Sequence, residues 1–120
     1  MTEYYIISLK HTSKGDTALT FWGHDSNGYT WHRDRAGLYT EEEMKKCISP
    51  DNVAVLKETV DPYWMNATDF SDKYISVPNN YGVLYNFGIL ESAKKFMKPK
   101  KYAGCRMTFV NTPVKIINPS

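Results

Sequence analysis

Residues 3–10, EYYIISLK, are rich in aromatic and β-branched side chains and are followed by the polar stretch HTSKGD. This composition favours a β-strand. Successive residues of a strand face opposite sides. Both faces would then be apolar, one formed by Tyr5, Ile7 and Leu9 and the other by Tyr4 and Ile6. We therefore expect a strand in the middle of a sheet, or one that a helix covers.

The next segment predicts a β-hairpin. Residues 17–22, TALTFW, and 29–33, YTWHR, are two further strand-like runs joined by GHDSNG. Within that connection, Asn27-Gly28 is a residue pair that tolerates positive φ, as a tight hairpin or a slightly longer loop requires.

A short helix is predicted after Thr40, in YTEEEMKKCI. Thr40 as N-cap and Glu43 at the third helical position form a capping box. Glu41 precedes Lys45 by four residues, in the acid-first order that stabilises a helix. The buried stripe of this helix is expected to consist of Met44, Cys47 and Ile48.

The middle of the chain is less regular. Residues 53–60, VAVLKETV, fit either a strand or a buried helical turn, and their valines favour a strand. Residues 61–73, DPYWMNATDFSDK, resemble a long connection, and YISVP predicts a short strand that ends at a proline. Tyr63 and Trp64 on this connection either contribute to function or plug one edge of the core.

The C-terminal third predicts a longer helix, because apolar residues recur at spacings of three and four within NNYGVLYNFGILESAKKFM, residues 79–97. Asn79 or Asn80 would cap it, and two internal glycines each weaken it by about 1 kcal/mol relative to alanine. CRMTFV, residues 105–110, adds one more expected strand, and residues 110–120 an extended tail.

These elements predict a single α+β domain over residues 1–120, a mostly antiparallel sheet with one short and one longer helix packed on it. No segment approaches the eighteen or so apolar residues of a membrane span, and the N-terminus does not resemble a secretory signal, so we expect a soluble, cytoplasmic protein. Cys47 and Cys105 are expected as reduced thiols, and the sequence leaves the reactivity of both open.

The sequence offers little support for catalysis. The three histidines are scattered, HExxH and GxSxG are absent, and the two cysteines are far apart, so no metal and no cofactor are expected. Cys47 is predicted to lie on the buried face of the short helix, and Cys105 has no histidine near it in sequence, which weakens nucleophilic catalysis without eliminating it. A small hydrolase or nucleic-acid-processing enzyme stays open as a third hypothesis.

Aromatic rings and cations gather around the predicted hairpin. Alternation places Tyr29, Trp31 and Arg33 on one strand face, and Trp22 can join them across the hairpin. Cations hold phosphates while rings stack on bases, so this mixture favours a phosphorylated small molecule. The candidate ligand-binding residues are Lys10, Trp22, Tyr29, Trp31, Arg33 and Arg35.

Other interpretations of these residues remain. Arg33 and Arg35 could instead pair with nearby carboxylates on the surface. A net charge of +2 neither requires nor forbids a nucleic-acid partner, which is not favoured here.

The runs YYIISLKHT, LTFWG, GYTW and AGLYTEEE resemble the N-terminal pattern of small, mostly uncharacterised proteins of tailed bacteriophages and prophages. The resemblance covers roughly residues 4–43, with a looser echo at VPNNYGVLY. It implies a viral accessory protein acting in the bacterial cytoplasm. Many such proteins counter host defence by binding a host protein or by sequestering a nucleotide signal.

Two non-catalytic hypotheses follow. The first is a phage accessory protein that counters host defence by binding a nucleotide-type signalling molecule. The second is a protein inhibitor that docks on a host defence or CRISPR component through Tyr63, Trp64 and the hairpin, because Trp, Tyr and Arg are typical anchors of protein interfaces. A homodimer is plausible for either.

Overall fold

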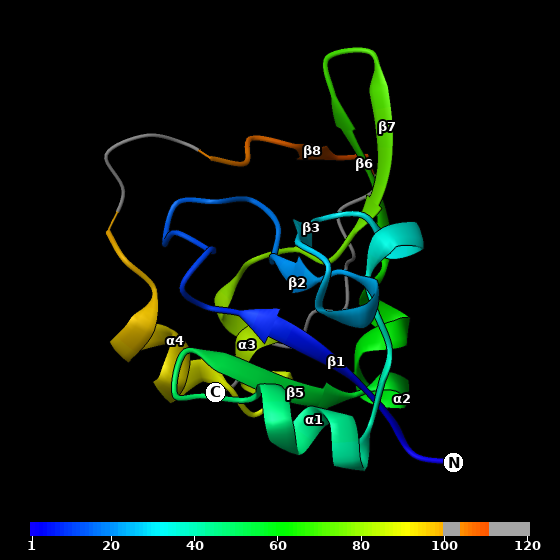
Figure 1. The fold of residues 1–120 in the computed structure, drawn as a ribbon. Coiled ribbons are helices and arrows are strands. Elements are labelled where there is room, and N and C mark those ends of the chain that lie inside the picture. The colour runs from blue at the N-terminus through cyan, green and yellow to red at the C-terminus, as the bar shows by residue number, and fades with distance from the viewer. Residues whose placement is uncertain (100–103, 111–120) are drawn as a thin grey trace.

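Strand β1 (Glu3–Ser8) lies at the centre of the larger of two sheets in the computed structural model, which describes residues 1–99 and 104–110 (Figure 1). It pairs antiparallel with β2 (Phe21–Trp22), β4 (Tyr39–Thr40) and β5 (Asn52–Leu56). β3 (Tyr29–Thr30) pairs with β2 and forms an edge of this sheet. The prediction of a central strand with two apolar faces is confirmed, because Tyr5, Ile6 and Ile7 are all buried.

The smaller sheet has the strand order β7-β6-β8, with β6 (Met65–Asp69), β7 (Asp72–Ser76) and β8 (Thr108–Phe109). The expected long connection over residues 61–73 is therefore wrong, since most of it forms the β6–β7 hairpin. Met65 and the buried Ala67 alternate with the polar Asn66 and Thr68, but the alternation stops at Asp69 and was too short to mark a strand. The expected strand within residues 105–110 is confirmed as β8.

Helix α1 (Glu41–Cys47) begins with the predicted capping box: Glu43 N donates to Thr40 Oγ1 at 3.2 Å, and Thr40 N donates to Glu43 Oε1 at 2.9 Å. Its expected buried stripe is wrong. Met44 and Cys47 are only partly buried and Ile48 is 45% exposed. α1 directly follows the short strand β4 and packs mainly beside β4 and β1, so its apolar side is only partly covered by the residues described.

Two other segments that were each predicted to form one element form two elements in the structure. Residues 53–60 begin as β5 and continue as the short helix α2 (Lys57–Val60), followed by the 3₁₀ turn η3 (Asp61–Tyr63). The predicted longer helix is two helices, α3 (Tyr81–Asn86) and α4 (Leu90–Phe96). Gly88 between them has φ +74°, which ends α3 in the left-handed conformation. Asn80 caps α3 as expected, accepting from Val83 N at 3.0 Å.

The main core lies between one face of the larger sheet and helices α3 and α4 (Figure 1). A smaller core joins the first hairpin to the second sheet, and it comprises Ala18, Ala67, Cys105 and Met107 with Trp31, Tyr74 and Phe109 packed against them. The α+β class with antiparallel sheets and short helices is confirmed. No helix in the described part of the chain could cross a membrane. Residues 111–120 of the predicted tail lie outside the described residues.

Candidate functional site

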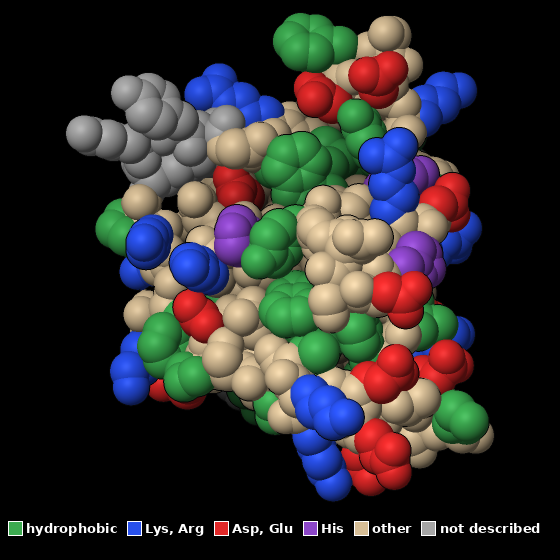
Figure 2. All heavy atoms as spheres, in the orientation of Figure 1, with side chains coloured by type: hydrophobic (Ala, Val, Ile, Leu, Met, Phe, Trp, Pro, Cys, Tyr) green, Lys and Arg blue, Asp and Glu red, His purple; other side chains and the backbone are tan. Residues whose placement is uncertain are grey.

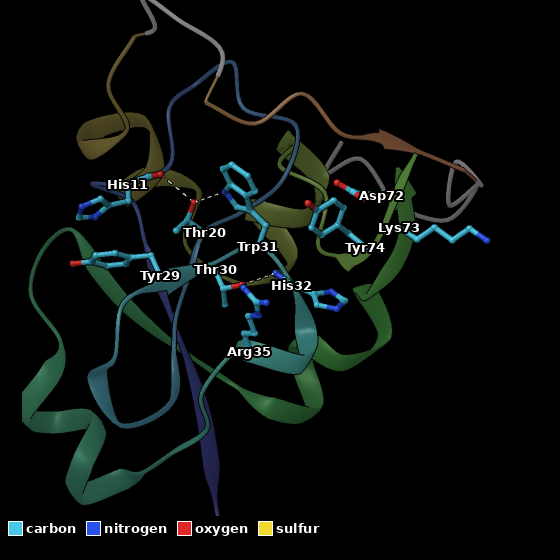
Figure 3. Close-up of a pocket in the computed structure, with 10 residues that line it drawn as sticks. All are labelled: His11, Thr20, Tyr29, Thr30, Trp31, His32, Arg35, Asp72, Lys73 and Tyr74. Carbon is cyan, nitrogen blue, oxygen red and sulfur yellow. Dashed lines mark hydrogen bonds between the residues drawn. The ribbon is translucent and has the colours of Figure 1, made fainter. Parts of the chain in front are cut away.

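An open groove lies where the edges of the two sheets approach each other. β3 is an edge strand of the larger sheet and β7 is an edge strand of the smaller one. The groove has a volume of about 660 Å³. Its lining, drawn in Figure 3, consists of His11, Thr20, Tyr29, Thr30, Trp31, His32, Arg35, Asp72, Lys73 and Tyr74.

A preformed aromatic stack stands on one side of the groove. The rings of His11 and Tyr29 are nearly parallel, with centroids 3.8 Å apart and an interplanar angle of 25°. His11 Nδ1 lies 3.0 Å from Ser8 Oγ, which fixes the orientation of the imidazole. Tyr29 is nevertheless 51% exposed, so its ring remains available to a ligand.

Trp31 is held by a chain of hydrogen bonds at the centre of the groove (Figure 3). Its indole Nε1 donates to Thr20 Oγ1 at 2.9 Å, and that hydroxyl donates to the His11 carbonyl at 3.0 Å. The indole also packs against the smaller core. Since both interactions restrict its rotamer, Trp31 presents a rigid aromatic surface, and a ligand that binds there would lose little side-chain entropy of Trp31.

His32 fastens the two walls to each other. Its Nδ1 accepts a hydrogen bond from the backbone N–H of Ile75 in β7 at 3.1 Å. Nδ1 is therefore unprotonated, and the proton of the neutral ring is on Nε2, which lies 3.3 Å from Asp34 Oδ2. The imidazole also meets the Tyr74 ring edge-on at 5.8 Å. The groove thus has a fixed width at this point.

Arg35 is the cation best placed for an anionic ligand. It ends the 3₁₀ turn η2 (Arg33–Arg35) and is exposed. Among residues 1–99 and 104–110, no hydrogen bond or ion pair joins its guanidinium to another side chain. Lys73 also belongs to the lining, although its chain extends away from the other residues in Figure 3. Asp72 adds one carboxylate.

Three of the six predicted ligand-binding residues line this groove, namely Tyr29, Trp31 and Arg35. Trp22 does not, because its Nε1 donates to Asn52 Oδ1 at 3.0 Å. Lys10 is exposed outside the lining.

Arg33 is also outside the lining. The expected alternation of Tyr29, Trp31 and Arg33 is wrong, because β3 ends at Thr30 and η2 turns the chain. Arg33 instead lies near enough to Tyr5 for its charge to act on the pKa of that phenol.

Sequence reasoning missed the remaining lining residues. His11 directly follows the first predicted strand and Thr20 lies within the second, residues 17–22, and single polar side chains at such positions gave no specific signal. Asp72, Lys73 and Tyr74 were assigned largely to a connection, so the whole second wall was unforeseen. An edge-strand interpretation of DKYIS would have been needed to find it.

Tyr63 and Trp64 pack into the main core. The Trp64 ring lies 5.5 Å from that of Tyr5 and 4.8 Å from that of Phe21, and its Nε1 donates to Asp61 Oδ1 at 3.2 Å. Tyr63 meets the Phe87 ring edge-on at 5.1 Å. This arrangement favours the alternative in which both residues plug an edge of the core.

Asp61 organises a polar cluster below these rings. Tyr5 OH donates to Asp61 Oδ1 at 2.9 Å, and Lys57 Nζ lies 2.6 Å from Asp61 Oδ2. Burial and the bond to Asp61 raise the pKa of Tyr5 to about 12, and the same carboxylate raises the pKa of Lys57. Tyr5 is 5% exposed, so its hydroxyl is closed to a substrate, whereas the side chains of Lys57 and Asp61 are partly exposed.

Three nucleophilic side chains are the first candidates for catalysis within residues 1–99 and 104–110, namely Ser8, Cys47 and Cys105. Ser8 faces His11, yet the Ser8 side chain is fully buried and out of reach of a substrate. Cys105 is buried, and Cys47 has Ser26 Oγ at 3.9 Å as its neighbour. No group of three metal-ligating side chains converges within the residues described.

Comparison with family models, with curated proteins and with solved structures finds no match to this chain. A function is therefore inferred from the groove itself.

Proposed function

We propose that this protein binds a nucleotide-type ligand in the groove between β3 and β7 without transforming it. One observation carries the proposal: a stacked Tyr29, a rigid Trp31 and an unpaired Arg35 converge on one open groove of about 660 Å³. This volume is within the range of small-molecule sites.

The residues offer complementary chemistry for such a ligand. Each base stacked on an aromatic ring contributes about 1–3 kcal/mol to binding. A guanidinium can hold a phosphate through two parallel hydrogen bonds, as Arg35 is free to do. Asp72 would repel a phosphate at its own end of the groove but can accept a hydrogen bond from an exocyclic amino group of a base. The ligand would therefore lie with its phosphate toward Arg35.

Non-catalytic capture agrees with the side chains present. Ser8 and Cys105, which carry the chemistry of a nucleophile, are both buried. A protein of this kind would act by lowering the free concentration of its ligand. The resemblance of residues 4–43 to phage accessory proteins supports a role against bacterial host defence, with a nucleotide signal as the captured molecule. The packing of Tyr63 and Trp64 gives no support to docking on a host protein through those two residues.

Isothermal titration calorimetry against linear and cyclic nucleotides, with protein near 100 μM, tests the proposal. We expect at least one ligand with Kd below about 100 μM, a value that such concentrations detect. Arg35→Ala should weaken binding about tenfold or more, the loss expected for a charge-assisted hydrogen bond. Tyr29→Phe keeps the stacking ring and should bind as the original does, whereas Tyr29→Ala should not.

Arg33→Ala is the matched control, because Arg33 is an exposed arginine of the same 3₁₀ turn that lies outside the lining. It should change Kd by less than about threefold, as expected of a weakly interacting surface charge. No heat with any nucleotide, or equal losses for Arg33→Ala and Arg35→Ala, would refute the site.

A further inference from the structure

The β6–β7 hairpin ends in an aromatic side chain that the fold does not use. Phe70 lies in the two-residue turn between Asp69 and Asp72, at the tip of a hairpin that projects from the body of the protein (Figure 1). Phe70 is 100% exposed, and Figure 2 shows a hydrophobic side chain beside acidic ones at the tip of this hairpin. An apolar ring so placed contributes nothing to the core and exposes its full surface to water.

The backbone at this tip is also unfavourable. Phe70 has φ +54°, a conformation that glycine adopts easily and that a bulky side chain rarely does. Asp69 and Asp72 stand directly opposite each other across the hairpin, where like charges destabilise a strand pair. Three local costs at one tip indicate a benefit outside the monomer.

A pocket on another part of the protein has an apolar lining with two lysines among its residues. It lies over α3 and α4 and has a volume of about 270 Å³. A dry cavity of about 150 Å³ can hold a benzene ring, so this pocket has room for a phenylalanine side chain. Leu84, Ala93 and Met97 are among its apolar lining, and Lys14 and Lys94 also line it.

No carboxylate belongs to the lining of this pocket. Lys94 has a neighbour in Glu91 at 3.3 Å, but both side chains of this pair are largely exposed, and such pairs are weak. The two lysines can therefore face the two aspartates that flank Phe70. An aromatic tip with acidic flanks on one copy matches an apolar pocket with basic flanks on another.

We propose that two copies of this chain associate by inserting Phe70 of each into the α3–α4 pocket of the other. Asp69 and Asp72 of the tip face Lys14 and Lys94 of the partner copy. A reciprocal exchange about a two-fold axis doubles the contact and closes the assembly as a dimer. Each tip buries a small area, so the association is reversible and of micromolar strength. Phe70 and the α3–α4 pocket lie outside the lining of the ligand groove, whereas Asp72 belongs to both surfaces, so the Phe70 variants separate the dimer from ligand binding.

Sedimentation velocity over about 10–500 μM protein tests the dimer, a range that brackets micromolar dissociation constants. The original protein should shift from monomer to dimer, and Phe70→Ser should stay monomeric. Phe70→Gly should also stay monomeric while its melting temperature rises, because glycine relieves the positive φ. Tyr85→Ser is the matched control: Tyr85 is 54% exposed on α3 but does not line the pocket, so its loss should leave the dimer intact.

Charge reversal tests the identity of the pocket. Lys14→Glu with Lys94→Glu should raise the dissociation constant about tenfold, the effect of two surface ion pairs turned repulsive. Adding Asp69→Lys and Asp72→Lys to the same chain should restore association. A protein that stays monomeric at 500 μM, an association indifferent to Phe70→Ser, or a failure of the charge reversal to restore binding would each overturn the proposal.

Discussion

Replacing Trp64 by alanine should lower the free energy of unfolding of this protein, because Trp64 is a residue of the core and not of a binding surface. The indole packs against the rings of Tyr5 and Phe21, with centroid separations of 5.5 Å and 4.8 Å, and donates to Asp61 at 3.2 Å. Trp64→Ala would remove both ring contacts and leave a void beside β1. We therefore expect a large loss in the free energy of unfolding.

The size of this loss can be worked from the contacts. Truncating a core tryptophan costs about 3–5 kcal/mol. Trp64 is only partly buried, which places the expected cost near the lower limit, about 3 kcal/mol. Trp64→Phe keeps a ring against Tyr5 and Phe21 but loses the hydrogen bond to Asp61, so it should cost about 1 kcal/mol. The difference between the two variants separates ring packing from the polar contact.

Urea denaturation followed by circular dichroism measures both losses, and an unchanged slope with urea shows that the unfolded reference is unaltered. Tyr85→Ala, which removes an exposed ring from α3, should change stability by less than about 0.5 kcal/mol. A cost below about 1 kcal/mol for Trp64→Ala would refute the structural role, because a core tryptophan should lose several times that amount. If the same variant lost a binding partner from host lysate, Trp64 would instead be an interface anchor.

Three further outcomes follow from single residues. Thr40→Ala removes the N-cap of α1 and should cost about 1 kcal/mol in urea denaturation. The backbone N–H and then the side chain of Thr40 lower the pKa of Glu43, so they contribute stability that is present above its usual pKa near 4.5 and lost as pH falls. Thr40→Ala keeps the backbone donor, so it should reduce that acid dependence of the melting temperature only in part, whereas Glu43→Gln should remove it. Gly88→Ala places a side chain at φ +74° in open space and should cost about 1–2 kcal/mol without a clash, whereas a milder loss would show that the turn relaxes. Folding raises the pKa of Tyr5 from 10.0 to about 12, so the protonated phenol stabilises the folded state below pH 10, and this contribution is lost as pH rises toward 12. In an absorbance titration, Tyr5 should therefore ionise late, and this late step should be missing in Tyr5→Phe.

The sequence predicted those parts of the fold in which local chemistry agrees with the final structure. The strand at residues 3–10 carries apolar residues on both faces, and β1 is indeed central. Thr40 and Glu43 satisfy each other within one helical turn, so the capping box could be identified without tertiary information. The same holds for Asn80, which caps α3 by a bond to a residue three positions away.

Errors arose where packing determines structure. The apolar spacing of residues 79–97 fits one helix, but Gly88 allows the chain to turn so that α3 and α4 both face the core. The apolar stripe of α1 was assigned to the interior because periodicity reports which residues share a face, and it does not report whether another layer covers that face. Ile48 remains 45% exposed for this reason.

Only one of the two walls of the groove could be predicted from the sequence, because a backbone hydrogen bond positions the other wall. The wall carrying Tyr29 and Trp31 follows from the Asn27-Gly28 hairpin signal, which is local. The wall carrying Tyr74 is positioned by a bond from the Ile75 N–H to His32, across 43 residues of sequence. Any residue except proline offers a backbone N–H, so the residue types in β7 do not indicate that His32 is the acceptor. Arg35 lines the groove together with the rings of Tyr29 and Trp31, whereas Arg33 does not. The turn η2 that follows β3 positions both arginines. The short 3₁₀ turn η2 therefore determines which of its two arginines lines the groove. Comparing the ligand affinities of Arg35→Ala and Arg33→Ala tests this difference.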